Sequence, residues 1–238
     1  MRQLNKHKSW LNSLKTFGEI GSEKVSETLS VMVGGNFEIE SIKANLCTIM
    51  DIPKVLNPGG SSELLISINM SLAGQLNGRS VLVFPWESAE RLDRKLWSQI
   101  DTPPQFLSEI SYLALKELGN VITSTYMILL EDYLDVTLMP TVPEFSVGFA
   151  KSVLESLIYE YTKREKFLFC LSTGFIEKEL AIKGNILIFL VSQSTQILLK
   201  SLKKNSTTET SDFIESIPAK GKISQVRSAC FSKINSLS

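Results

Sequence analysis

Apolar residues recur at helical spacing in the middle of the chain, within SYLALKELGNVITSTY at residues 111–126. At about 3.6 residues per turn they form one continuous apolar arc, which predicts a long helix over Gln105–Glu131. Glu117 and Asn120 stand three residues apart at the edge of this arc, so they share one side of the helix. A carboxylate and an amide at that place can be held by the core and still reach an incoming partner. They are therefore the first candidates for chemistry.

The chain before this helix changes from a helical pattern to a strand pattern. A first long helix is predicted over Trp10–Val33, and it ends at Gly34-Gly35 because glycine commonly follows a helix end. Short apolar and β-branched runs then predict strands, and Asn77-Gly78 predicts the turn of a hairpin. The predicted elements are strands Phe37–Ile42 and Leu46–Met50, a loop at residues 52–62, hairpin strands Leu64–Leu72 and Arg79–Phe84, and a helix over Trp86–Trp97.

The second half of the chain repeats this order after the long helix. The predicted elements are a strand over Leu134–Thr141, an amphipathic helix over Glu144–Tyr161, hairpin strands Phe167–Thr173 and Leu180–Leu190, and a helix over Ser192–Leu202. Residues 205–238 are rich in Ser, Thr, Lys and Asn and lose the apolar period, which is typical of a disordered or weakly docked tail. Within this tail, DFIESI at residues 212–217 is a short amphipathic patch, so a docking role stays open.

The repetition extends to individual residues. LKTFGEIG at residues 14–21 aligns with LKELGNVI at residues 115–122. Residues 78–92 align with residues 184–198 at nearly the same offset, and the aligned pairs match glycine with glycine and strand with strand. Self-similarity of this kind indicates two copies of one supersecondary unit.

The duplication predicts an α+β fold. Two units, about 8–100 and 105–203, would pack around a pseudo-twofold axis with the long helices on a mostly antiparallel β-sheet, so that residues 1–204 form one domain. Gly119 lies in mid-helix, where glycine is unfavourable unless another backbone approaches closely. The approaching backbone is that of a partner or that of the sister helix, and because Gly18 repeats the glycine in the first copy, we expect the sister helix.

Composition narrows the classes of function. The formal net charge of zero gives no global sign of binding to nucleic acid or to an anionic membrane, and no apolar run approaches the ~18 residues that a membrane span needs. Cys47, Cys170 and Cys230 are far apart and odd in number, which favours reduced thiols in a cytoplasmic protein. The single histidine, His7, argues against a Ser-His-Asp triad and against a histidine-based metal site.

At these residues the chain resembles the CheC family of chemotaxis phosphatases, whose relatives include CheX and the FliY middle domain. In the family's helix motif a Ser or Asp precedes a Glu by four residues, and an Asn follows that Glu by three. The segments that carry the resemblance are ALKELGNVITSTY at 114–126, its partly degenerate copy LKTFGEIGSEKVSETL at 14–29, NGRSVLVFPWESAERL at 77–92 and PEFSVGFAKSVLESL at 143–157. Their order and duplication are more specific than any one of them.

The resemblance implies an enzyme that removes the phosphoryl group from the phospho-aspartate of a CheY-type response regulator. It implies that Asn120 orients the attacking water and that Glu117 anchors the receiver domain by pairing with its lysine. The amide of Asn120 suits this role because it donates or accepts a hydrogen bond without a protonation step. The enzyme would need no cofactor of its own, because the receiver supplies Mg²⁺. The expected partner is the phosphorylated receiver, and CheD, which some family members bind, is a second candidate.

The chain departs from the family motif in both copies. In the first copy Thr16 and Glu19 replace the Glu and the Asn, so that site is expected to be inactive or to serve only for binding. In the second copy Leu113 replaces the Ser or Asp, which leaves the turnover rate open. The alternative function is therefore that of a non-catalytic adaptor, such as a receiver-binding scaffold or a flagellar-switch component.

Overall fold

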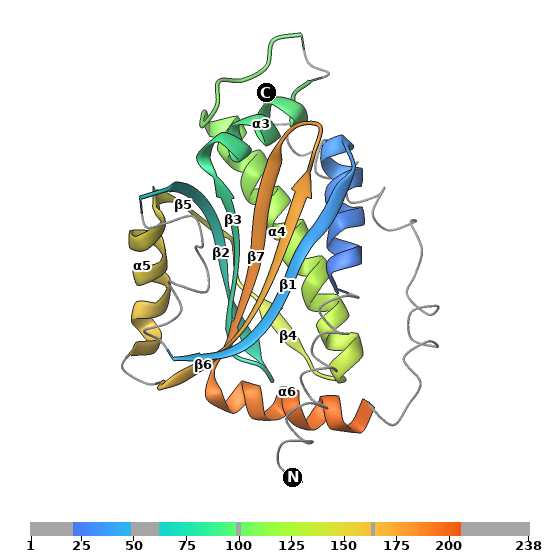
Figure 1. Ribbon diagram of the computed structural model, residues 1–238, viewed down its shortest axis with the longest axis vertical. Helices are drawn as coiled ribbons and strands as arrows, with labels where there is room; N and C mark the ends of the chain where they lie inside the picture. Colours follow the sequence, from blue (N-terminus) through green and yellow to red (C-terminus); the bar gives the residue numbers. More distant parts are fainter. Residues whose placement is uncertain (1–20, 49–61, 99–100, 163–164, 206–238) are drawn as a thin grey trace.

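A computed structural model describes residues 21–48, 62–98, 101–162 and 165–205 of the protein. Within these ranges the chain forms one antiparallel sheet of seven strands, with α5 on one face and the other described helices on the opposite face (Figure 1). The first half contains a helical stretch at residues 21–29, the π-helical turn η1 (Ser30–Gly34), β1 (Phe37–Thr48), β2 (Leu64–Gly74), β3 (Gly78–Pro85) and α3 (Trp86–Leu96). The second half contains α4 (Glu109–Leu134), β4 (Leu138–Pro140), β5 (Glu144–Phe149), α5 (Ala150–Thr162), β6 (Phe167–Glu177), β7 (Ile182–Leu190) and α6 (Ser192–Asn205).

The order of strands reveals the internal symmetry. The strands lie in the order β1-β6-β7-β3-β2-β4, and β5 also pairs with β2. The hairpins β2–β3 and β6–β7 meet at the centre, where β3 and β7 are antiparallel. Outside them, β1 of the first half pairs with β6, and β5 of the second half pairs with β2. Each half therefore supplies the outer strand of the other half's hairpin, which confirms the predicted pseudo-twofold α+β fold.

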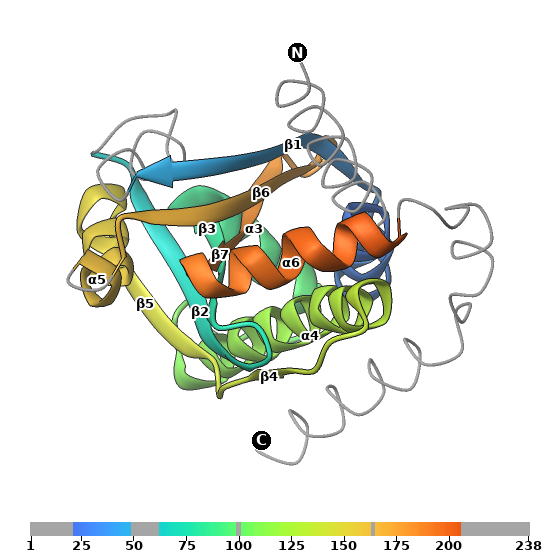
Figure 2. The ribbon, with the colours of Figure 1, turned by 90° about the horizontal axis from the view of Figure 1, so that it is seen from below.

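The two faces of the sheet carry two separate apolar clusters. Along β3, Leu82 and Phe84 belong to the cluster that contains the buried side of α4, whereas Val81 and Val83 belong to a cluster that includes residues of α5. Figure 2 shows α4 and α5 on opposite sides of β2. Because helices pack on both faces, these strands read as continuous apolar runs and not as alternating ones.

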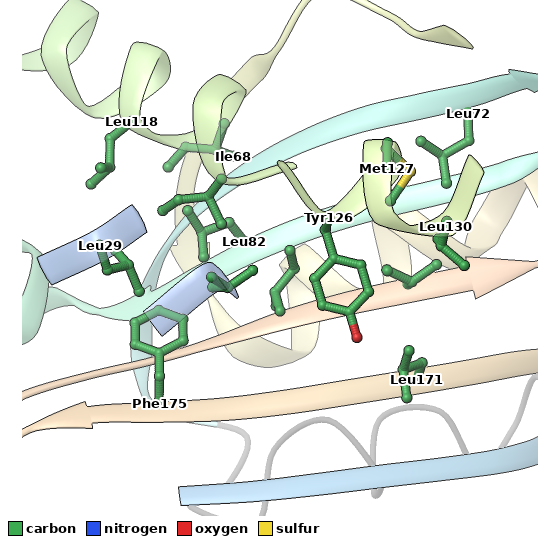
Figure 3. Packing of buried hydrophobic residues seen from close by; sticks show 14 of the residues in the cluster. Leu29, Ile68, Leu72, Leu82, Leu118, Tyr126, Met127, Leu130, Leu171 and Phe175 are labelled. Carbon is green, nitrogen blue, oxygen red and sulfur yellow. The ribbon is translucent and has the colours of Figure 1, made fainter. Parts of the chain in front are cut away.

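The larger cluster fixes α4 to the sheet. Figure 3 shows Leu118, Tyr126 and Met127 of α4 pointing toward strand residues such as Ile68 and Leu82. All five of these side chains are buried. Burying side chains of this size stabilises the packing by about 1.5–3 kcal/mol each, so one side of α4 is held firmly and only its other side can meet a partner.

The predicted pair of strands after the first helix is wrong, because the structure has one strand there. β1 runs without a break over Phe37–Thr48, opposite β6 from Glu177 to Phe167. Its register shifts between Ile39 and Ser41, which is typical of a β-bulge. A continuous partner strand supplies backbone hydrogen bonds across the polar residues that interrupt the apolar pattern, so tertiary pairing overrides the local signal.

The predicted helix over Glu144–Tyr161 begins too early. Its first six residues form β5, which pairs antiparallel with β2, and the hydroxyls of Ser67 and Ser146 lie 2.7 Å apart across this pair. The helix α5 starts only at Ala150, whose N–H donates to the carbonyl oxygen of Glu63 at 2.8 Å. An edge position beside β2 was available to this segment, and the sequence pattern did not reveal it.

The boundaries of the other predicted helices and strands agree in part with those in the structure. Both hairpins, α3 and α6 are confirmed, and Gly34 and Gly35 end the first helix with φ of 77° and 149°. The predicted strand over Leu134–Thr141 shrinks to β4, because α4 continues to Leu134. Residues 10–20 of the predicted first helix, most of the predicted loop and residues 206–238 of the predicted tail lie outside the described residues.

Candidate active site

Glu117 and Asn120 lie on the outward side of α4, and both are partly exposed. Leu113 lies one turn before Glu117 and Ser124 one turn after Asn120, and these two residues are also partly exposed. At about 100° per residue the four positions fall within one narrow sector of the helix, opposite the buried residues. We name Leu113, Glu117, Asn120 and Ser124 the α4 strip. The candidate carboxylate and amide are thus presented on one surface and are not enclosed by the core.

Gly119 brings α4 close to the sheet. A Cβ atom at this position would lie 2.6 Å from Cγ2 of Ile68 on β2. Within the described residues, the close neighbour of Gly119 is therefore a side chain of strand β2 and not the backbone of the sister helix that was predicted. Gly18 lies outside the described residues. The glycine sets the depth of α4 on the sheet directly beneath the pair Glu117 and Asn120.

The start of α4 is fixed by a buried polar cluster that the sequence pattern did not reveal. Ser108 caps the helix, and its side chain accepts a hydrogen bond from the Ser111 N–H at 3.4 Å. The hydroxyl of Ser111 donates to Oδ1 of Asp93 at 2.7 Å, and Nε1 of Trp97 donates to the same oxygen at 3.1 Å. Asp93 and Trp97 lie at the end of α3, so the cluster ties α3 to the first turn of α4.

This cluster predicts a pH dependence of stability. Burial raises the pKa of Asp93, although the hydrogen bonds from Ser111 and Trp97 lower it in part. A carboxyl group with a raised pKa in the folded state binds its proton more tightly there than in the unfolded state. Its contribution to stability is therefore fully present below the unfolded pKa and is lost as the pH rises through the folded pKa.

We compare the free energy of unfolding of wild type with that of Asp93→Asn. As the pH rises from about 4 toward neutrality, we expect the wild-type value to fall relative to the variant. The slope is about 1.4 kcal/mol per pH unit between the pKa of Asp93 in the unfolded state and its pKa in the folded state. Asparagine keeps an acceptor oxygen for Ser111 and Trp97 but does not ionise. Urea unfolding of both proteins between pH 4 and 7 measures the difference. A difference that is constant over this range would contradict the assignment.

Tyr126 is a polar aromatic residue on the buried side of α4, in the second half of the helix. Its side chain is fully buried between the sheet and the helical stretch 21–29. Burial raises the pKa of Tyr126, and hydrogen bonding with the side chains of Thr173 and Ser22 lowers it only in part. The phenol is therefore kept neutral and serves packing between α4, β6 and the first helix.

A chain of aromatic contacts lies beside the α4 strip. The Nζ atom of Lys116 lies over the ring of Tyr112, 5.2 Å from its centroid. The ring of Tyr112 in turn makes an edge-to-face contact with Phe145 of β5, with centroids 4.7 Å apart at an interplanar angle of 65°. The spacing of Tyr112 and Lys116 by four residues was a usable sequence signal. The contact with Phe145 was not, because it depends on the placement of β5.

The two described cysteines lie in the apolar cluster on the α5 face of the sheet, away from the α4 strip. Cys47 and Cys170 are buried, reduced thiols, and burial raises the pKa of Cys170. In this part of the chain, no group of three or more His, Cys, Asp or Glu side chains is arranged to hold a metal ion. None of the described helices combines the length and the apolar content that crossing a membrane requires. His7, Thr16 and Glu19 lie outside these ranges.

The chain is similar to chemotaxis and flagellar proteins. No protein-family model matches it. The CheY-P phosphatase CheC of Bacillus subtilis (strain 168) is 24% identical over 170 residues, which cover 71% of this chain and 80% of that protein. The structure of Thermotoga maritima FliY superposes with a TM-score of 0.60 at 15% identity, covering 81% of this chain and 96% of that one. The FliM middle domain from H. pylori superposes with a TM-score of 0.55 at 14% identity, covering 82% and 98%.

Proposed function

We propose, on the premise that the chain is similar to CheC in sequence and to FliY in fold, that it hydrolyses the phospho-aspartate of a CheY-type response regulator. The observation that carries the proposal is the α4 strip. Glu117 and Asn120 are partly exposed one turn apart on a helix whose opposite side is held by the sheet. Such a surface can enter the phosphorylation site of another protein without rearranging its own core.

The proposed mechanism is positioning. Hydrolysis of an acyl phosphate needs a water in line with the phosphorus and stabilisation of charge on the phosphoryl oxygens. Asn120 would hold that water through its amide, which needs no change of protonation. The receiver would supply the Mg²⁺ and the lysine that stabilise the charge, so this chain would need no cofactor of its own.

Glu117 would provide the anchor. Its carboxylate, one turn from Asn120 along α4, would pair with the lysine of the receiver and so fix the distance between the amide and the phosphorus. Leu113, at the position where the family has Ser or Asp, presents an apolar side chain to the partner instead of a hydrogen-bonding group. We therefore propose one working site, on α4, with the CheY-type receiver as its partner.

The test is the decay of receiver phosphate with and without the protein. We expect wild type to accelerate the decay and Glu117→Gln to raise KM about tenfold, because a charge pair at an interface contributes about 1.5 kcal/mol or more. Glu155→Gln is the matched control, since Glu155 is an exposed glutamate on α5, on the other side of the sheet. Equal decay rates with and without wild type would refute the phosphatase assignment.

The second candidate is a non-catalytic adaptor that binds the receiver. It is motivated by Leu113 and by the fold, which is also that of the FliM middle domain. This candidate predicts binding of the phosphorylated receiver without faster loss of phosphate. A binding measurement that finds no complex would exclude it, and a faster decay would favour the enzyme.

A further inference from the structure

Lys116 is the cation nearest in sequence to both candidate site residues. It directly precedes Glu117, and it lies one turn before Asn120 on the same side of α4. Neighbouring residues on a helix point about 100° apart, so Lys116 and Glu117 do not face each other. The ammonium group therefore adds a positive charge to the border of the α4 strip, on the side where Asn120 lies.

The position of this charge is set by the fold and not by the helix alone. Long helical side chains lean toward the preceding turn, and Nζ of Lys116 accordingly lies 5.2 Å from the centroid of the Tyr112 ring. The edge-to-face contact with Phe145 holds that ring in turn. Phe145 packs against the main core cluster and belongs to β5, which is paired with β2. Two side chains, Tyr112 of α4 and Phe145 of β5, thus restrict where the ammonium group of Lys116 can be.

A surface lysine that binds nothing gains little from being restrained by aromatic contacts, because its ammonium group is solvated in any rotamer. A lysine restrained beside a binding surface loses less conformational entropy when a partner arrives. The phosphoryl group of a phospho-aspartate is negatively charged, so a fixed cation at the border of the strip matches the charge of the surface that would approach it.

We propose that Lys116, held by Tyr112 and Phe145, is a docking residue that attracts the negatively charged phosphorylation site of the receiver onto the α4 strip. The inference rests on the proposed receiver partner, and it concerns association and not the chemical step. Lys116 is thus a positioning residue that sets affinity and its salt dependence, while Asn120 acts on the water.

The test measures the affinity for CheY from the same organism, activated with beryllium fluoride and Mg²⁺, at 50 and 300 mM NaCl, together with phosphatase turnover. Lys116→Gln should raise Kd about three- to fivefold at low salt and flatten the salt dependence, with kcat within about twofold of wild type. Lys116→Arg should retain wild-type affinity. Tyr112→Phe, which keeps the ring, should bind like wild type, and Tyr112→Leu should lose part of the affinity.

Lys151→Gln removes the same charge from an exposed lysine on α5 and serves as the control. If Lys116 has only a structural role, Lys116→Gln will lower Tm and leave Kd and its salt dependence as in wild type, which overturns the inference. Suppose that the affinity of wild type falls with salt, that Lys116→Gln removes this dependence, and that wild type does not accelerate dephosphorylation. The docking role then stands and the phosphatase assignment fails. If wild type and Lys116→Gln dephosphorylate the receiver equally at both salt concentrations and bind it equally, the phosphatase assignment stands and the docking role fails.

Discussion

Asn120→Ala is expected to lower the turnover of receiver phosphate about 100-fold while binding to the receiver stays within a few-fold of wild type. The amide is proposed to hold the attacking water, and misplacing a reacting group by one bond length is enough for a loss of this size. Stability should change little, because Asn120 is partly exposed and lies outside the apolar clusters. Single-turnover decay of labelled receiver phosphate, measured with the protein in excess, separates turnover from affinity.

The matched control for this variant is Ser124→Ala. Ser124 lies on the same strip one turn further along α4, is partly exposed, and carries a small polar side chain that has no proposed role in the reaction. Its turnover should stay within about threefold of wild type, the range expected for a surface contact at the border of an interface. If Asn120→Ala and Ser124→Ala lose turnover equally, the water-holding role of Asn120 is wrong.

Gly78→Ala should produce the largest loss of stability, a decrease in the free energy of unfolding of about 3 kcal/mol. Gly78 begins β3 and faces Leu190 at the centre of the sheet, where the two halves meet. A Cβ atom here would lie 1.9 Å from the carbonyl oxygen of Phe189, and a backbone atom cannot move aside as a side chain can. The central strands would have to separate locally and lose hydrogen bonds. Urea unfolding followed by circular dichroism gives the change.

Gly148→Ala is the control for the effect of the substitution itself. Gly148 lies in β5, at the edge of the sheet, and a Cβ atom there would first meet Cγ2 of Val153 at 3.3 Å. That methyl group can shift, so the free energy of unfolding should change by less than about 1 kcal/mol. If Gly78→Ala also lowered the free energy of unfolding by less than about 1 kcal/mol, the centre of the sheet would tolerate the extra atom and the two halves would not be tightly joined there.

The sequence was sufficient to identify most of the architecture, because local patterns and duplication point in the same direction. The apolar arc around Leu118 predicted α4, and Asn77-Gly78 predicted the turn between β2 and β3. The pattern failed where an element depends on its partner. Glu144–Phe149 became a strand because β2 offered its edge, and β1 became continuous because β6 runs beside its whole length.

For the candidate site, the sequence by itself determined which residues share a helical surface, since the spacing of Glu117 and Asn120 fixes their relative direction whatever surrounds the helix. Only the tertiary structure decided that this surface is the outward one, because exposure depends on where the sheet lies. It also decided that Gly119 meets Ile68 and that Phe145 lies against Tyr112. Contacts between residues far apart in the chain arise from packing, and no local pattern encodes them.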